Sequence, residues 1–305
     1  MSLLMLMMAC AGEDTVEPVN LVEDFPAAPA GGEQWLSPVL EIPAYTDAMM
    51  CTVYTYEGDD VGVNSVETYQ SDHGHHTLLL RTELDDDDHP DGETFDCTEA
   101  ESLDMTSTAP IIISGDGIAG EAFSLPDGMA SNFERGDRVL VQSHYINPTD
   151  TPILVQDAIN LGYLPEDEVE IWASFYSHVL LDHPIPGGNV ETTHTITCEW
   201  EEDLNLLFLG GHMHEWGEHI AIDMTRDDQV SRLYEVEQWL PEHRDDPPVS
   251  DYSVEPFQVL AGDTFTTSCT WFNDTDEELN FPNEMCANFG MMYPQKTPII
   301  CDGEE

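Results

Sequence analysis

Clustered histidines are the residues whose spacing in this sequence most clearly suggests chemistry. Among the 12 histidines are the neighbouring pair His75-His76 and the triplet His212-Met213-His214. If the triplet ends a strand, His212 and His214 point to the same face, because side chains alternate along a strand. Two imidazoles on one face can share a metal ion. The alternative is a pair of exposed histidines on a solvated strand.

The pair His75-His76 is a less obvious metal site, because neighbours on a regular strand face opposite sides. Both rings can reach one ion only if the chain bends there, and Gly74 makes a bend easy. The alternative interpretation is a polar turn. His144 lies in the segment that starts at Gln142, and taken alone it is typical of a structural histidine.

A methionine in the segment 283–295 favours the metal-site interpretation of these histidines over the structural one. Met285 lies next to Cys286 in the sequence Asn-Glu-Met-Cys. A methionine beside a disulfide cysteine usually belongs to the core, but a thioether is also a soft ligand suited to Cu(I), whereas imidazole suits copper generally. Histidine pairs with one candidate methionine and no spare thiolate favour copper over structural zinc.

The charge of the chain excludes several classes of partner. Its 62 acidic residues stand against 7 basic ones, for a formal net charge of −55. Such a chain does not bind a phosphate backbone or an anionic membrane surface, because both are gripped by Lys and Arg. Hydrophobic residues make up 41% of the chain, so a core can form. We therefore expect a small-molecule substrate, no nucleic acid and no obligate protein partner.

The N-terminus predicts export. A short apolar run, residues 3–9, precedes Cys10 and has the shape of a bacterial lipoprotein signal. We therefore expect a signal at residues 1–10 with lipidation at Cys10, a flexible acidic tether at 11–34, and a chain lipid-anchored at the bacterial cell envelope. Membrane contact is then through the anchor alone. The alternative is a frayed terminus. The other six of the seven cysteines imply up to three disulfides, whose pairing the sequence pattern leaves open.

The pattern of apolar runs predicts an all-β fold. Short runs rich in β-branched and aromatic residues alternate with Gly, Pro, Asn and Asp turns. At this length two β-sandwich domains are favoured, at 35–164 and 165–305, joined near Gly162. The spacing of apolar residues at 232–240 allows one short helix of a turn or two. The strands are expected at residues 50–54, 77–80, 111–113, 138–145, 152–156, 204–209 and 265–272.

Taken together, the motifs resemble those of the copper type II, ascorbate-dependent monooxygenases, the family of dopamine β-monooxygenase and peptidylglycine α-hydroxylating monooxygenase. Four motifs follow in the order of the family. They are His75-His76, His144-Tyr145-x-Asn147-Pro148, His212-x-His214, and Glu284-Met285-Cys286 running on to Tyr293-Pro294-Gln295.

The resemblance implies two copper sites on two antiparallel, jelly-roll-like β-sandwiches that face each other across a cleft. One is an electron-transfer copper bound by His75, His76 and His144. The other is a catalytic, oxygen-binding copper bound by His212, His214 and Met285. The resemblance also implies three disulfides, namely Cys51–Cys97, Cys198–Cys301 and Cys269–Cys286.

The activity implied is hydroxylation of a C–H bond of a small organic substrate, with O2 as oxidant and ascorbate or a similar compound as reductant. The alternative is a non-catalytic copper-binding surface lipoprotein used for scavenging or storage. Gly210 stands where peptide-hydroxylating members have Arg, and Phe289 stands where they have Tyr. Both departures argue against a peptide C-terminus as substrate, and the acidic charge favours a cationic amine through electrostatic steering.

Overall fold

The computed structural model describes residues 21, 25–85, 87–97, 108–112, 122–244, 246–281 and 283–302. The predicted signal, the lipidation site Cys10 and most of the predicted tether lie outside the described residues. Strand β1 (Glu33–Leu36) already begins in the last two residues assigned to the tether. Its Gln34 side chain donates a hydrogen bond of 2.9 Å to Oδ1 of Asn160. In the part of the chain that is described, no helix has the length and apolar character needed to cross a membrane.

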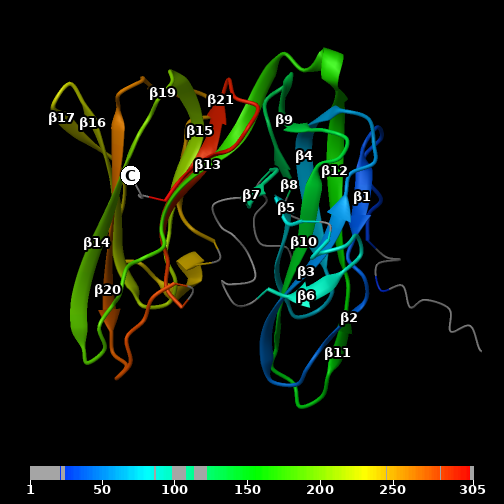
Figure 1. Cartoon of the computed structure of the whole chain (residues 1–305), viewed down its shortest axis with the longest axis horizontal. Helices are drawn as coiled ribbons and strands as arrows, with labels where there is room; N and C mark the ends of the chain where they lie inside the picture. The colour runs from blue at the N-terminus through cyan, green and yellow to red at the C-terminus, as the bar shows by residue number, and fades with distance from the viewer. Residues whose placement is uncertain are drawn as a thin grey trace, which may run out of the picture.

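The described chain is built almost wholly of strands, which confirms the predicted all-β class (Figure 1). In the N-terminal half, two sheets pack face to face, with a small two-stranded sheet of β2 (Leu40–Ile42) and β11 (Ile153–Val155) beside them. One sheet contains β1, β12 (Asp157–Pro165), β4 (Val61–Gln70), β9 (Met129–Phe133) and β8 (Ala122–Ser124). The other contains β6 (Thr94–Asp96), β3 (Thr46–Thr55), β10 (Arg138–Asn147), β5 (Gly74–Arg81) and β7 (Ala109–Pro110).

The C-terminal half repeats this two-layer arrangement. One layer contains β13 (Ile171–Leu180), β21 (Cys286–Tyr293), β15 (Leu204–His212), β18 (Val249–Asp251), β19 (Phe257–Val259) and β22 (Ile299–Cys301). The other contains β14 (Val190–Glu199), β20 (Thr264–Asn273), β16 (Gly217–Arg226) and β17 (Gln229–Val236). Short 3-10 turns lie at η2 (Glu166–Glu168) and η3 (Pro241–Arg244).

Strand β13 connects the two halves. It follows β12 through η2, pairs in parallel with β9 of the N-terminal half, and pairs antiparallel with β21 of the C-terminal half. One continuous sheet therefore runs through both halves, which lie side by side in Figure 1. The division at residue 164 falls at the end of β12, and the exact domain limits stay a prediction.

Buried and exposed side chains alternate along the strands, and this alternation explains why the sheets pack in two layers. In β20 the side chains of Phe265, Thr267, Cys269 and Trp271 are buried, and those between them are less buried. Such a pattern gives a strand one core face and one outer face. Leu206 of β15 joins Phe265 in one hydrophobic cluster of the C-terminal half, so the two sheets there share a core.

Two expected elements are wrong. The residues at 232–240 form no helix, because β17 pairs with β16 as far as Val236 and alternation buries Tyr234 and Val236. Tertiary pairing here overrides the helical spacing of the apolar residues. The strand expected at 111–113 is instead a bend at Ile111 and Ile112 after the short β7, and residue 113 lies outside the described residues. Both isoleucines are apolar because they are buried in the core.

Three disulfides are present among the described residues. Two connect the two layers of the C-terminal half, and the third lies at the paired strands β3 and β6 of one sheet. The three bonds join Cys51 to Cys97, Cys198 to Cys301, and Cys269 to Cys286. The pairings are those that the family resemblance implies. The bond between Cys269 and Cys286 ties β20 to the first residue of β21, directly after Met285.

Candidate metal centres

A β-bulge places the first histidine cluster. Strand β5 pairs with β10 so that His144 lies opposite His76, but the next residue, Tyr145, lies opposite Gly74. His75 is therefore the extra residue of a bulge, and a bulge re-aims side chains that would otherwise face opposite sides. The bend that Gly74 makes possible is therefore present at His75, where it allows both His75 and His76 to face one metal ion.

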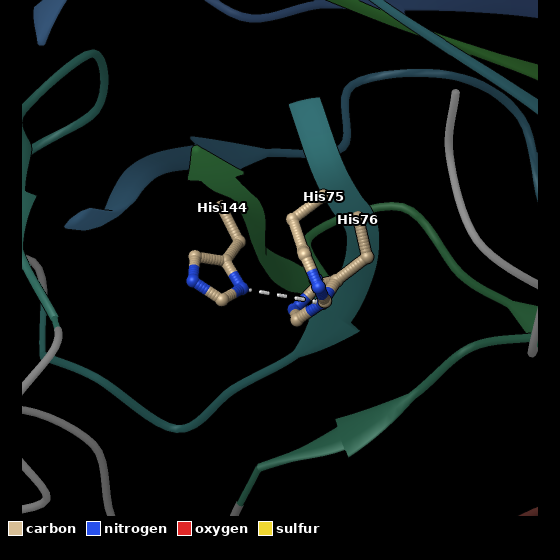
Figure 2. A group of neighbouring side chains, drawn as sticks. All are labelled: His75, His76 and His144. Carbon is tan, nitrogen blue, oxygen red and sulfur yellow. Dashed lines mark hydrogen bonds between the residues drawn. The ribbon is translucent and has the colours of Figure 1, made fainter. Parts of the chain in front are cut away.

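The three imidazoles converge. Figure 2 shows His75 and His76 from β5 turned toward His144 from β10. One ring nitrogen of each lies within 4.8 Å of the others, in a group that could hold a metal ion. The ring centroid of His144 is 4.8 Å from those of both His75 and His76. An ion bound at about 2 Å from each nitrogen fits between such rings after small rotations.

Hydrogen bonding identifies the ligand atom of His144. Its Nε2 lies 2.6 Å from Oδ1 of Asp47, and a carboxylate only accepts, so Nε2 carries the proton. Its Nδ1 is therefore the unprotonated nitrogen that can bind a metal ion, and it lies 3.4 Å from Nδ1 of His76 in the hydrogen bond drawn in Figure 2. Burial lowers the pKa of His144, although Asp47 raises it, so burial favours the neutral, ligating imidazole.

A buried polar network lies behind this cluster. The Gln70 side chain donates to the carbonyl oxygen of His76 at 3.0 Å, to that of His144 at 3.4 Å and to Asp157 Oδ1 at 3.2 Å. The hydroxyl of Tyr145 also donates to Asp157, which is fully buried. Burial raises the pKa of Asp157 to about 6. The network holds both ligand strands from behind. Sequence reasoning missed it because Gln70 and Asp157 belong to none of the motifs and meet only in the fold, 87 residues apart in the sequence.

Removing the Asp47 carboxylate is expected to weaken metal binding at this cluster. Without an acceptor at Nε2, His144 loses the bond that fixes its tautomer and ring orientation, which typically costs about 10-fold or more in metal affinity. We expect Asp47→Ala to lower copper affinity by about that factor and Asp47→Asn, which keeps an acceptor, to lower it less. Competition against a copper chelator measures this. The exposed Asp127→Ala is the matched control, and equal affinities for both alanine variants would refute the role of Asp47.

The second cluster lies at the end of β15. His212 is the last residue of that strand, and His214 follows two positions later with its ring centroid 5.1 Å from that of His212. On the adjacent strand Ala287 lies opposite His212, and Met285 precedes it by two residues. Residues two apart on a strand share a face, so Met285 is brought to the side of the sheet that carries His212.

The His214 ring is also oriented by a hydrogen bond. Its Nδ1 lies 3.3 Å from the carbonyl oxygen of Asn283. Because a carbonyl only accepts, Nδ1 donates the proton and Nε2 is left as the ligand atom. The acceptor comes from the segment that carries Met285, so the bond also links the two ligand segments.

Glu284 ties the ligand segments of this cluster together. Its carboxylate accepts hydrogen bonds from the backbone N–H of His214 at 3.0 Å and of Trp216 at 2.7 Å. It also accepts from Nε1 of Trp271 at 2.8 Å and from the N–H of Met285 at 3.3 Å. Burial raises the pKa of Glu284 to about 7, although these hydrogen bonds lower it. A single buried side chain thus fixes the backbone around two candidate ligands.

One cavity of about 1240 Å³ connects the two clusters. His76 and His144 line it from the N-terminal half, and His212, His214 and Met285 line it from the C-terminal half. Arg244 of η3 lines it too, and its charge is among the minor causes that lower the pKa of His144. Gln142, expected near His144, is another lining residue.

The donor sets fit copper. Three imidazoles suit a copper ion in either oxidation state, and two imidazoles with a thioether favour Cu(I). The described cysteines at 51, 97, 198, 269, 286 and 301 are all in disulfides, so none of them offers a thiolate at either cluster.

Comparison with known proteins supports this chemistry. Residues 173–304 match the family model described as copper type II ascorbate-dependent monooxygenase, C-terminal domain. The resemblance to this family is thereby confirmed over the C-terminal half of the chain. That segment contains His212, His214 and Met285.

Other comparisons are less informative. No curated protein matches the chain. Among solved structures, the major capsid protein P2 of bacteriophage PM2 is 10% identical, with 86% of this chain and 98% of that chain covered and a TM-score of 0.33. Peptide:N-glycanase F is 11% identical, with 86% and 97% covered and a TM-score of 0.36. At these TM-scores we draw no conclusion from either protein.

Proposed function

We propose that the chain is a copper- and ascorbate-dependent monooxygenase that hydroxylates a C–H bond of a small organic substrate. The observation that carries the proposal is that two different donor sets meet at one cavity. One is a group of three imidazoles, of which His76 and His144 line the cavity, and the other is two imidazoles with a thioether. Storage or scavenging requires no such difference between sites. The match of residues 173–304 to the family supports the same conclusion.

In this proposal His75, His76 and His144 hold the electron-transfer copper, and His212, His214 and Met285 hold the catalytic copper. Copper supplies one-electron redox chemistry and oxygen activation when bound. One oxygen atom enters the C–H bond and the other leaves as water, with two electrons from ascorbate and two protons. Asp47 and the carbonyl of Asn283 each accept a hydrogen bond from the protonated nitrogen of a histidine ring. The other nitrogen of each ring is then unprotonated and can bind the metal.

The ligands of the two sites are held in place by different contacts. His75, His76 and His144 lie within or at the bulge of paired strands backed by Gln70. Met285 precedes β21 and depends on Glu284 and on the disulfide at Cys286 for its position. Rigid ligand geometry is what orients a metal for catalysis.

Copper titration combined with oxygen uptake tests the proposal. We expect binding to saturate at two copper ions per chain, and ascorbate to support oxygen uptake that rises when a substrate is added. The panel contains amines and uncharged aromatic compounds. Binding of two ions without substrate-dependent uptake would instead favour a copper-binding surface protein.

A further inference from the structure

The sheet that carries His212 presents an apolar face to the cavity. Along this face, Phe289 of β21 lies opposite Ser177 of β13 on one side and Gly210 of β15 on the other. Val249 of β18 lies opposite Gly210. All of these except Gly210 line the cavity. Because residues two apart share a face, this row is next to the row of His212.

Four phenylalanine rings follow one another along the cavity. Phe289 is stacked with Phe175 at 6.5 Å between centroids and meets Phe208 edge-on at 6.5 Å. Phe208 in turn meets Phe123 of β8 edge-on at 6.1 Å. These rings line the cavity from β13 to a strand of the N-terminal half. Such pairs favour a further aromatic ring beside them.

The Phe289 ring lies over Gly210. A Cβ at position 210 would lie 2.9 Å from Cζ of Phe289 and 3.1 Å from Cγ1 of Val249. The absence of a side chain at this position is therefore what lets the two apolar side chains close the wall. No polar side chain fits here without displacing the ring.

Charge is missing from the part of this face nearest His212. The chain has 62 acidic residues, yet the row of His212 holds Val179 and Ala287, and the next row holds Phe289 with Ser177, Gly210 and Val249. The first acid on the face is Asp251, which lies opposite Phe208, two residues from Gly210 along β15. The other charged residues that line the cavity lie outside these strands, and they are Asp47, Glu215, Arg244 and Asp246. A charged substrate group placed against the nearer rows loses hydration without gaining a partner, which is costly.

We propose that the cleft next to His212 binds an uncharged molecule that carries an aromatic ring, with the ring against Phe289 and the target C–H bond directed toward His212, His214 and Met285. This inference rests on the proposed function for the identity of the reaction, but the binding surface does not depend on turnover. It differs from the cationic amine that net charge alone favours, because the two rows of β13, β21 and β15 beside His212 hold no acidic side chain. Glu215, which follows His214 and also lines the cavity, is paired with Arg244.

Calorimetric titration of the full-length chain with three ligands of similar size tests the charge preference. The ligands are 2-phenylethanol, 2-phenylethylammonium and 3-phenylpropanoate. We expect the uncharged alcohol to bind most tightly, by about 10-fold over either ion. Tighter binding of the ammonium or the carboxylate would overturn the proposal.

Variants then locate the binding surface. Phe289→Ala is expected to weaken binding of 2-phenylethanol by about 10-fold, and Gly210→Ala to weaken it because the added Cβ displaces the ring. The matched control Phe272→Ala removes an exposed ring of β20 and should change nothing. Asp251→Asn should also leave binding of the alcohol unchanged. Unchanged affinity in Phe289→Ala, with its fold verified by circular dichroism, contradicts the assignment.

Binding and turnover separate the two proposals. If the alcohol binds but no compound is hydroxylated, the binding surface at Phe289 is supported and the proposed monooxygenase activity is refuted. If only charged substrates are hydroxylated and the alcohol does not bind, the monooxygenase activity is supported and the binding surface is refuted.

Discussion

Replacement of Met285 by leucine is expected to abolish turnover while copper remains bound at His75, His76 and His144. Leucine keeps the volume of the side chain but removes the sulfur that favours Cu(I). Since even the outer contacts of a metal ligand are worth about 10–100-fold, loss of the ligand itself should cost about 100-fold or more in turnover. Oxygen uptake and copper content per chain, measured on the same sample, give both quantities.

The control for this prediction is a methionine next to two of the candidate ligands. Met213 is buried in the core between His212 and His214 and does not line the cavity. Met213→Leu should therefore keep both copper ions and normal turnover. If Met285→Leu also turns over normally, the assignment of the catalytic copper is wrong.

The Glu284→Gln variant is expected to lose both stability and the copper at His212 and His214. The amide has one acceptor oxygen in place of two, so donors among the N–H groups of His214, Trp216 and Met285 lose their partner. Each buried donor left unsatisfied costs about 1–3 kcal/mol. We expect a lower melting temperature, loss of about one copper ion per chain, and an intact signal from the three-histidine site in electron paramagnetic resonance.

Glu199→Gln is the matched control for Glu284, because Glu199 is exposed at the end of β14. It should leave the melting temperature and copper content unchanged. A Glu284→Gln protein that binds both ions with normal affinity would show that the carboxylate has no positioning role, even if the melting temperature falls.

The all-β class and the three disulfides could be predicted from the sequence, because alternating apolar residues and family motifs are local signals. The strand at 265–272 was expected from its alternation and lies within β20. The pattern at 232–240 misled, because Tyr234 and Val236 are buried by pairing with β16, a long-range contact that helical spacing does not reveal.

The candidate ligands could be chosen from the sequence, but the contacts that orient them could not. The bulge at His75 depends on the register of β5 against β10. Asp47 is 97 residues from His144, and nothing in its local sequence marks it as a hydrogen-bond partner. Glu284 was part of a motif, yet its contacts to His214 and Trp216 appear only when residues about 70 apart meet. Such long-range contacts are properties of the fold.

The most direct test of the copper monooxygenase is isotope labelling with ¹⁸O₂. The copper-loaded chain is incubated with ascorbate and a panel of uncharged aromatic compounds and amines, and the products are analysed by mass spectrometry. The proposed chemistry predicts a hydroxylated product that contains one ¹⁸O atom from O2, formed by the native chain and lost in Met285→Leu. A chain that binds two copper ions but forms no labelled product from any compound, or a product labelled from water, would contradict it.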